Sequence, residues 1–147
     1  MIKSYYKDYG IENNTMKCSK VFRCLVLAIM LFFCSTVWGY DFEVDGIYYN
    51  ISDATNRTVS VVSGDNSYAG DIVIPENVII NGEAYKISTI GISAFDGCVD
   101  LASVVIPNGV ASISLFAFRG CTSLANLVIG NGVTQIMPNA FLNCTSL

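Results

Sequence analysis

The 147-residue chain contains no histidine, and charged residues make up only 14% of it. Catalysis by Ser-His-Asp or Cys-His groups needs an imidazole, as do many zinc sites, so these chemistries are excluded. The 8 basic residues face 12 acidic ones, which gives a net charge of −4. No basic patch exists to neutralise phosphates, which argues against a nucleic-acid partner. The composition therefore disfavours an enzyme from the outset, and we expect neither a metal nor a cofactor.

The few charges divide the chain into two unlike segments. Residues 1–39 carry five basic and two acidic residues, a net charge of +3. Residues 40–147 carry three basic and ten acidic residues, a net charge of −7. Three of the six cysteines also lie in the first segment. The two segments are therefore interpreted separately.

Residues 16–39 have the organisation of a secretory signal peptide: a basic start, an apolar run from Cys24 to Cys34 and a short stretch ending at Gly39. The uncharged run Cys24 to Trp38 has fifteen residues, fewer than the ~20 that a membrane-spanning helix needs. We expect cleavage after Gly39, export, and no membrane span in the mature chain. Residues 1–15 precede a complete signal peptide, so we expect them to be an upstream misread start.

The remaining chain repeats with a step of 23 residues. Ala-Phe pairs recur at 94, 117 and 140, and residues 102–124 and 125–147 share 13 of 23 positions without a gap. A fixed step of roughly 20–29 residues is the signature of a leucine-rich-repeat solenoid. The repeat positions that we expect to form the core are Phe95, Cys98, Leu101, Ile106, Ile113, Phe118, Cys121, Leu124, Ile129, Ile136, Phe141 and Cys144.

Each repeat predicts a short parallel strand followed by turns. Residues 101–106 carry an apolar pattern that suits a strand with one inward face. Pro107-Asn108-Gly109 then turns the chain, because glycine tolerates positive φ and proline cannot continue a ladder. Val110 and Ile113 bring the chain back along the opposite side, and residues 117–121 suit a tight helical or 3₁₀ turn. Phe118 should fill the centre of its coil and stack on the equivalent rings of its neighbours.

This pattern resembles the 23-residue leucine-rich repeats of BspA-like bacterial surface proteins, also known as the Treponema type. The residues that carry the resemblance are Leu101, Val104, Ile106, Pro107, Val110, Ile113, Ala117, Phe118 and Cys121. It covers 102–147 closely and 69–101 with an insertion, although Gly130 replaces the proline of the motif. The resemblance implies a secreted or outer-membrane-associated bacterial protein, displayed on the cell surface and attached to host proteins or neighbouring cells.

Two hairpins are predicted before the regular coils. Asp45-Gly46 and Asn81-Gly82 each lie between short apolar runs, which is a strong signal for a two-residue hairpin turn. We expect residues 40–68 to form an N-terminal β cap over the open end of the stack. Residues 69–101 would then be a degenerate first coil with the second hairpin inserted.

Three groups of residues invite a chemical role. Asp41, Glu43 and Asp45 resemble the start of a calcium-binding loop, but the loop's twelfth position is Ser52, so a solvated strand face is the better interpretation. Asp96 and Asp100 could form a paired-carboxylate site, yet neither recurs in later coils, and surface solvation is favoured. The three cysteines after residue 39 should be buried free thiols rather than disulfides, because stacked side chains point in parallel.

The remaining candidate for a functional site is an outward-facing surface of the strands. The residues between the inward positions of each strand face outward on what we expect to be the concave side: Asp71, Val73, Ser103, Val105, Asn126 and Val128. Valines beside small polar groups suit a protein or peptide partner, although strand propensity alone also explains them. We therefore predict an exported, non-catalytic binding or adhesion module. The alternatives are a scaffold region of a larger protein, whose catalytic domain would lie elsewhere, and a fragment, because the chain stops at Leu147 without a capping coil.

Overall fold

The computed structural model describes residues 39–65 and 67–147. The predicted misread start and signal peptide lie outside these residues, apart from Gly39, and so do the first three cysteines. No helix in the described part of the chain is both long and apolar enough to cross a bilayer.

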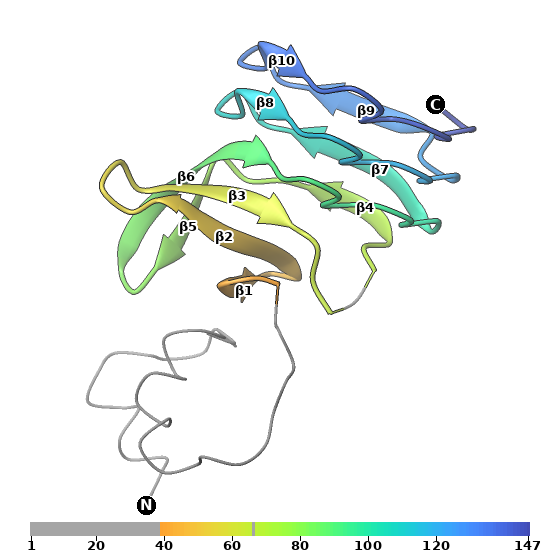
Figure 1. Ribbon diagram of the computed structural model, residues 1–147. Coiled ribbons are helices and arrows are strands. Elements are labelled where there is room, and N and C mark those ends of the chain that lie inside the picture. Colours follow the sequence, from red (N-terminus) through yellow and green to blue (C-terminus); the bar gives the residue numbers. More distant parts are fainter. Residues whose placement is uncertain (1–38, 66) are drawn as a thin grey trace, which may run out of the picture.

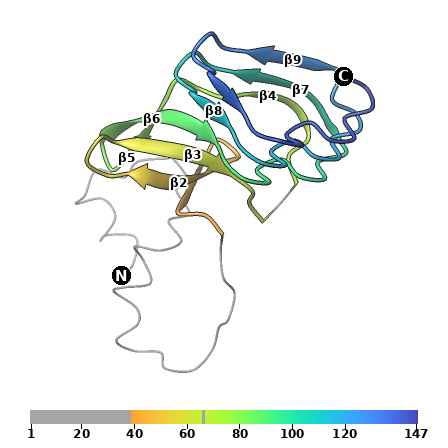
Figure 2. The ribbon, with the colours of Figure 1, turned by 45° about the horizontal axis from the view of Figure 1, so that its top comes forward.

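Within the described residues, ten strands form two sheets, which are the two walls of a solenoid (Figure 1). The smaller sheet is parallel and consists of β4 (Gly70–Val73), β7 (Leu101–Ile106) and β9 (Asn126–Ile129). The larger sheet has the order β1 (Phe42–Val44), β2 (Ile47–Asp53), β3 (Thr58–Val62), β6 (Glu83–Ile90), β8 (Ser112–Ile113) and β10 (Gln135–Ile136), with β5 (Asn77–Ile80) paired to β6. Figure 2 shows β4, β7 and β9 stacked along one wall.

The sequence pattern explains the strands of the smaller sheet. In β7, Leu101, Val104 and Ile106 are buried and the residues between them are not, as a strand with one inward face requires. The chain then turns at Pro107 and returns through Ile113 of β8, on the opposite wall. The predicted leucine-rich-repeat solenoid with short parallel strands is confirmed.

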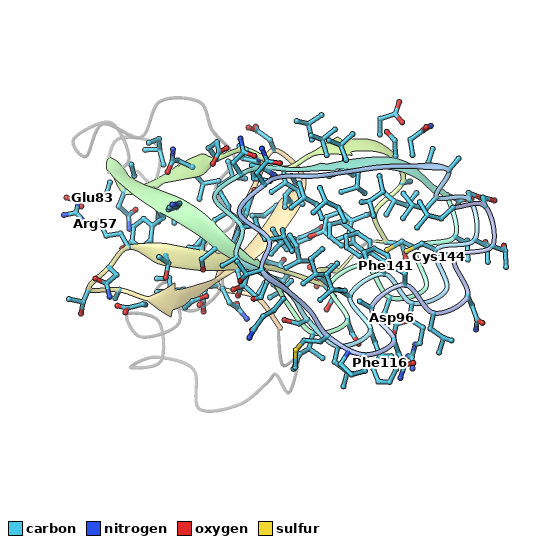
Figure 3. The ribbon with its side chains drawn as sticks, turned by 90° about the horizontal axis from the view of Figure 1, so that it is seen from above. Arg57, Glu83, Asp96, Phe116, Phe141 and Cys144 are labelled. Atoms are coloured by element: carbon cyan, nitrogen blue, oxygen red, sulfur yellow. The ribbon has the colours of Figure 1, made fainter. Side chains whose placement is uncertain are left out.

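Aromatic rings stack along the centre of the solenoid. The ring centroids of Phe95 and Phe118 lie 4.8 Å apart, and those of Phe118 and Phe141 lie 5.2 Å apart, with both pairs nearly parallel. Seen from above in Figure 3, Phe141 lies inside its coil. Tyr68 continues the stack below, with its ring 4.5 Å from that of Phe95. The predicted stacking of Phe118 on its two neighbours is confirmed.

The predicted helical or 3₁₀ turns were wrong, because none of the described residues forms a helix. Short i→i+3 hydrogen bonds do occur, for example from the Ala94 N–H to the Gly91 oxygen. Each coil, however, has two left-handed residues in this region, such as Ser93 and Gly97 in the first coil. A positive φ every few residues cannot extend a right-handed helix. The equivalent residues in the later coils are Phe116, Gly120, Asn139 and Asn143.

The last described coil is only half covered. Ile129 and Ile136 were expected in the core but are 37% and 53% exposed. They lie in β9 and β10, and no further coil packs against that side of them in the structure. Phe141 and Cys144, in the same coil, are partly buried against Phe118 and its neighbours. Burial in a stack depends on both neighbours, which a single repeat cannot reveal.

Both predicted hairpins are confirmed. β1 and β2 pair across Asp45-Gly46, and β5 and β6 pair across Asn81-Gly82, with positive φ at all four turn residues. The cap does not simply lie over the stack, because β3 pairs in parallel with β6 and extends the larger sheet. Tyr68 ties the cap together, since its hydroxyl accepts the Tyr48 N–H at 3.0 Å and donates to the Val62 oxygen at 2.7 Å.

Candidate binding surface

The outer face of the smaller sheet carries two parallel rows of side chains. Strand register aligns Asp71 with Ser103 and Ser103 with Asn126, and it aligns the valines at 73, 105 and 128 in the same way. We call these six residues the valine face: Asp71, Val73, Ser103, Val105, Asn126 and Val128. Val73 is 68% exposed and Val128 is 57% exposed, whereas Val105 between them is partly buried. The arrangement is a continuous apolar row with a polar row beside it.

The polar row, Asp71, Ser103 and Asn126, carries a charge only at its Asp71 end. The Ser103 hydroxyl donates a hydrogen bond of 2.5 Å to the Asp71 carboxylate, which fixes both side chains. Asn126 is exposed at the other end of the row. Because residues 101–147 contain only one charged residue, Arg119, the face becomes neutral along the stack. Such a surface suits a partner whose contacting groups are mainly apolar and uncharged.

The two carboxylates considered from the sequence, Asp96 and Asp100, have different surroundings in the structure. Asp96 accepts two hydrogen bonds from the Arg119 guanidinium, one of them 2.8 Å long from Nε. Arg119 also lies 4.7 Å from the centre of the Phe116 ring, which adds a cation–π contact. Figure 3 shows Asp96 and Phe116 at the outer rim of the coil. Asp96 is therefore an ion-pair partner, while Asp100 is exposed.

The three described cysteines are free, as predicted. The Cys121 thiol donates to the Phe95 oxygen, and the Cys144 thiol to the Phe118 oxygen, both at 3.0 Å. Burial raises the pKa of the Cys121 thiol to about 12, so this thiol stays protonated at neutral pH. Cys121 and Cys144 combine packing with a hydrogen bond between coils, and they are poorly suited to be nucleophiles.

The acidic residues of the first hairpin lie on strand edges and turns. Glu43 is in β1 and Asp45 is in the turn that follows. The Asp41 carboxylate accepts the Ile51 N–H at 3.0 Å. No group of three potential metal ligands gathers among residues 39–65 and 67–147.

Two clusters were missed by the sequence interpretation. One is the Asp96–Arg119 pair, whose partners are 23 residues apart, so the repeat step could have revealed it. The other is Glu76, whose carboxylate accepts the Asn108 and Gly109 N–H groups, both at 3.0 Å. Its offset of 32 residues, produced by the inserted hairpin, hides this contact from the 23-residue pattern.

Comparison with known proteins agrees with this geometry. The protein is similar to a leucine-rich repeat protein of Treponema pallidum, with 27% identity and a TM-score of 0.61 over 69% of this chain and 44% of that one. It is also similar to a leucine-rich repeat protein of Bacteroides ovatus, with 32% identity and a TM-score of 0.67 over 74% of this chain and 28% of that one.

A leucine-rich cell-surface protein of Faecalibacterium prausnitzii shares 28% identity, with a TM-score of 0.57 over 71% of this chain and 28% of that one. The chain therefore spans less than half the length of each of these three proteins. No curated protein sequence matches the chain significantly. A sequence model described as the BspA-type leucine-rich repeat region (6 copies) matches residues 66–147, more than half of the chain. The chain thus belongs to the BspA-type leucine-rich repeat family.

Proposed function

We propose that this protein is an exported, non-catalytic module that binds a protein partner on the valine face. The observation that carries the proposal is the row formed by Val73, Val105 and Val128, of which Val73 and Val128 are exposed and Val105 is half-buried. Three valines in register form an apolar strip, and the adjacent polar row offers hydrogen-bonding groups. Repeat solenoids commonly use such extended faces to bind other proteins.

Export and surface display rest on two supports. Residues 16–39 have the organisation of a signal peptide. The similar protein of Faecalibacterium prausnitzii is a cell-surface protein. Mass spectrometry of the exported protein should find a mature N-terminus at Tyr40. Attachment to host matrix proteins or to neighbouring cells follows as the adhesive form of this function.

Substitution of the central and last valines tests the binding face. The double variant Val105→Lys, Val128→Lys should lose at least about tenfold in affinity for a matrix protein that binds the unmodified chain, because two desolvated contacts become charged. Surface plasmon resonance against a panel of purified extracellular-matrix proteins measures this loss. Ile79→Lys is the matched control, since Ile79 is 58% exposed on β5, away from the valine face.

Two outcomes would count against the binding face. One is equal loss in the control, and the other is unchanged binding by the double variant with its circular dichroism intact. A folded protein that binds no member of the panel would favour the second candidate, a scaffold within a longer protein. The greater length of the three similar structures is the observation behind that candidate.

A further inference from the structure

Two turns of the stack have the same local sequence. Asn108-Gly109-Val110 and Asn131-Gly132-Val133 follow β7 and β9, one repeat apart. Both asparagines are exposed to solvent. Asn-Gly pairs are prone to spontaneous deamidation, because glycine has no side chain to hinder attack of its nitrogen on the asparagine amide. From sequence alone the two sites should therefore react at similar rates.

The structure protects the first site at both reacting groups. The Gly109 N–H, which would become the nucleophile, donates to the Glu76 carboxylate at 3.0 Å. The neighbouring negative charge also opposes loss of that proton. The Asn108 side-chain oxygen, which belongs to the amide under attack, accepts the Asn131 N–H at 2.9 Å.

The second site differs from the first at the glycine nitrogen. Within the described residues, no hydrogen bond engages the Gly132 N–H. Residues 101–147 contain no Asp or Glu, so none of them can play the part of Glu76 one coil later. We propose that Asn131 is a site of spontaneous deamidation and that Asn108 is its protected counterpart.

The reaction needs only water. The deprotonated Gly132 nitrogen attacks the Asn131 Cγ and forms a new bond to it, while the bond from Cγ to the amide nitrogen Nδ2 breaks with release of ammonia. Water then opens the resulting succinimide at either carbonyl and gives aspartate or isoaspartate. Either product places a carboxylate in residues 120–147, which otherwise hold no charged residue. Isoaspartate also adds a backbone carbon to the turn after β9.

Peptide mapping by mass spectrometry tests the proposal directly. The full-length protein is incubated in mildly alkaline buffer, with and without a denaturing concentration of urea, and conversion is followed at both asparagines. In urea the two sites should convert at similar rates. In the folded protein, conversion at Asn131 should exceed that at Asn108 severalfold. Equal rates in the folded protein would overturn the proposal, as would an Asn131 that converts only in urea.

The variant Glu76→Ala tests whether Glu76 is the group that protects Asn108. This variant should raise the rate at Asn108 toward that at Asn131, because it frees the Gly109 N–H but leaves the hydrogen bond to the Asn108 side-chain oxygen in place. Glu83→Ala is the matched control, since Glu83 is also an exposed acid but pairs with Arg57 on another turn. Continued protection of Asn108 in folded Glu76→Ala would show that Glu76 is not the protecting group. If that variant unfolds, the ratio of the two rates in the unmodified protein remains decisive.

Discussion

The cap and first coil, residues 40–100, and the later coils, residues 101–147, are stabilised in different ways. The ten acidic residues found between residues 40 and 147 all lie in the first region. Several hold individual main-chain groups: Asp53 accepts the Thr55 and Asn56 N–H groups, and Glu76 accepts two N–H groups of the next coil. The irregular region thus depends on specific side chains at specific positions.

The later coils rely on contacts that recur with the repeat. The Phe95 N–H donates to the Ala117 oxygen and the Phe118 N–H to the Ala140 oxygen, both at 2.7 Å. The thiol bonds of Cys121 and Cys144 also recur one coil apart. Because each contact is available to every coil, the later coils need almost no charged residues. Contacts that recur in every coil can therefore take the place of carboxylates that bind individual main-chain N–H groups.

The largest expected loss of stability comes from a substitution at the centre of the aromatic stack. Phe118→Ala should lower the free energy of unfolding by about 3–5 kcal/mol, because it removes a buried ring between two others. Urea denaturation measures the loss. Phe116→Ala is the control, since that ring is only partly buried and lies outside the stack. A loss below about 1 kcal/mol for Phe118→Ala would contradict its central role.

A smaller loss of stability is expected when a single hydroxyl is removed from the cap. Tyr68→Phe keeps the ring on Phe95 but removes the hydroxyl that accepts the Tyr48 N–H and donates to the Val62 oxygen. We expect a loss of about 1–3 kcal/mol in the same urea assay. Tyr85→Phe is the control, because no hydrogen bond to its hydroxyl occurs in the described part of the protein. Equal effects of the two variants would show that the cap does not depend on this anchor.

The smallest effects should come from two ion pairs: Arg57–Glu83 lies within the first region, and Asp96–Arg119 joins the two regions. Arg119 binds Asp96 through two nitrogens and also contacts Phe116, whereas Arg57 pairs with Glu83 through one nitrogen. Arg119→Met should therefore lower the urea midpoint slightly more than Arg57→Met, and added salt should reduce both differences. A larger loss from Arg57→Met would show that the cap uses its surface charges more than the coils do.

The fold was largely predictable because its determinants recur or are local. The 23-residue step placed Phe118 between Phe95 and Phe141, and the Asp-Gly and Asn-Gly pairs placed two hairpins. The rows of the valine face follow from the same step and the alternation of a strand. The binding of a partner to these rows stays a prediction.

The features that were missed depend on context. The exposure of Ile129 and Ile136 depends on what packs against their coil, which their own repeat does not encode. Phe116 has φ 58°, a left-handed conformation that is costly for a bulky residue and that its type does not suggest. Asn139 at the equivalent position of the next coil is of a type that adopts this conformation more often, so alignment of the coils could have revealed it.

The hydrogen bonds between the outer turns have a mechanical consequence. The N–H groups of Phe95, Gly97, Phe118 and Gly120 all donate to the coil that follows, so these bonds run along the axis of the stack. Tension applied between the two ends would load the coils in series and pull on these bonds lengthwise. Since each coil contacts only its neighbours, they would give way one at a time. A protein of this design would extend stepwise under shear and dissipate work before its fold is lost.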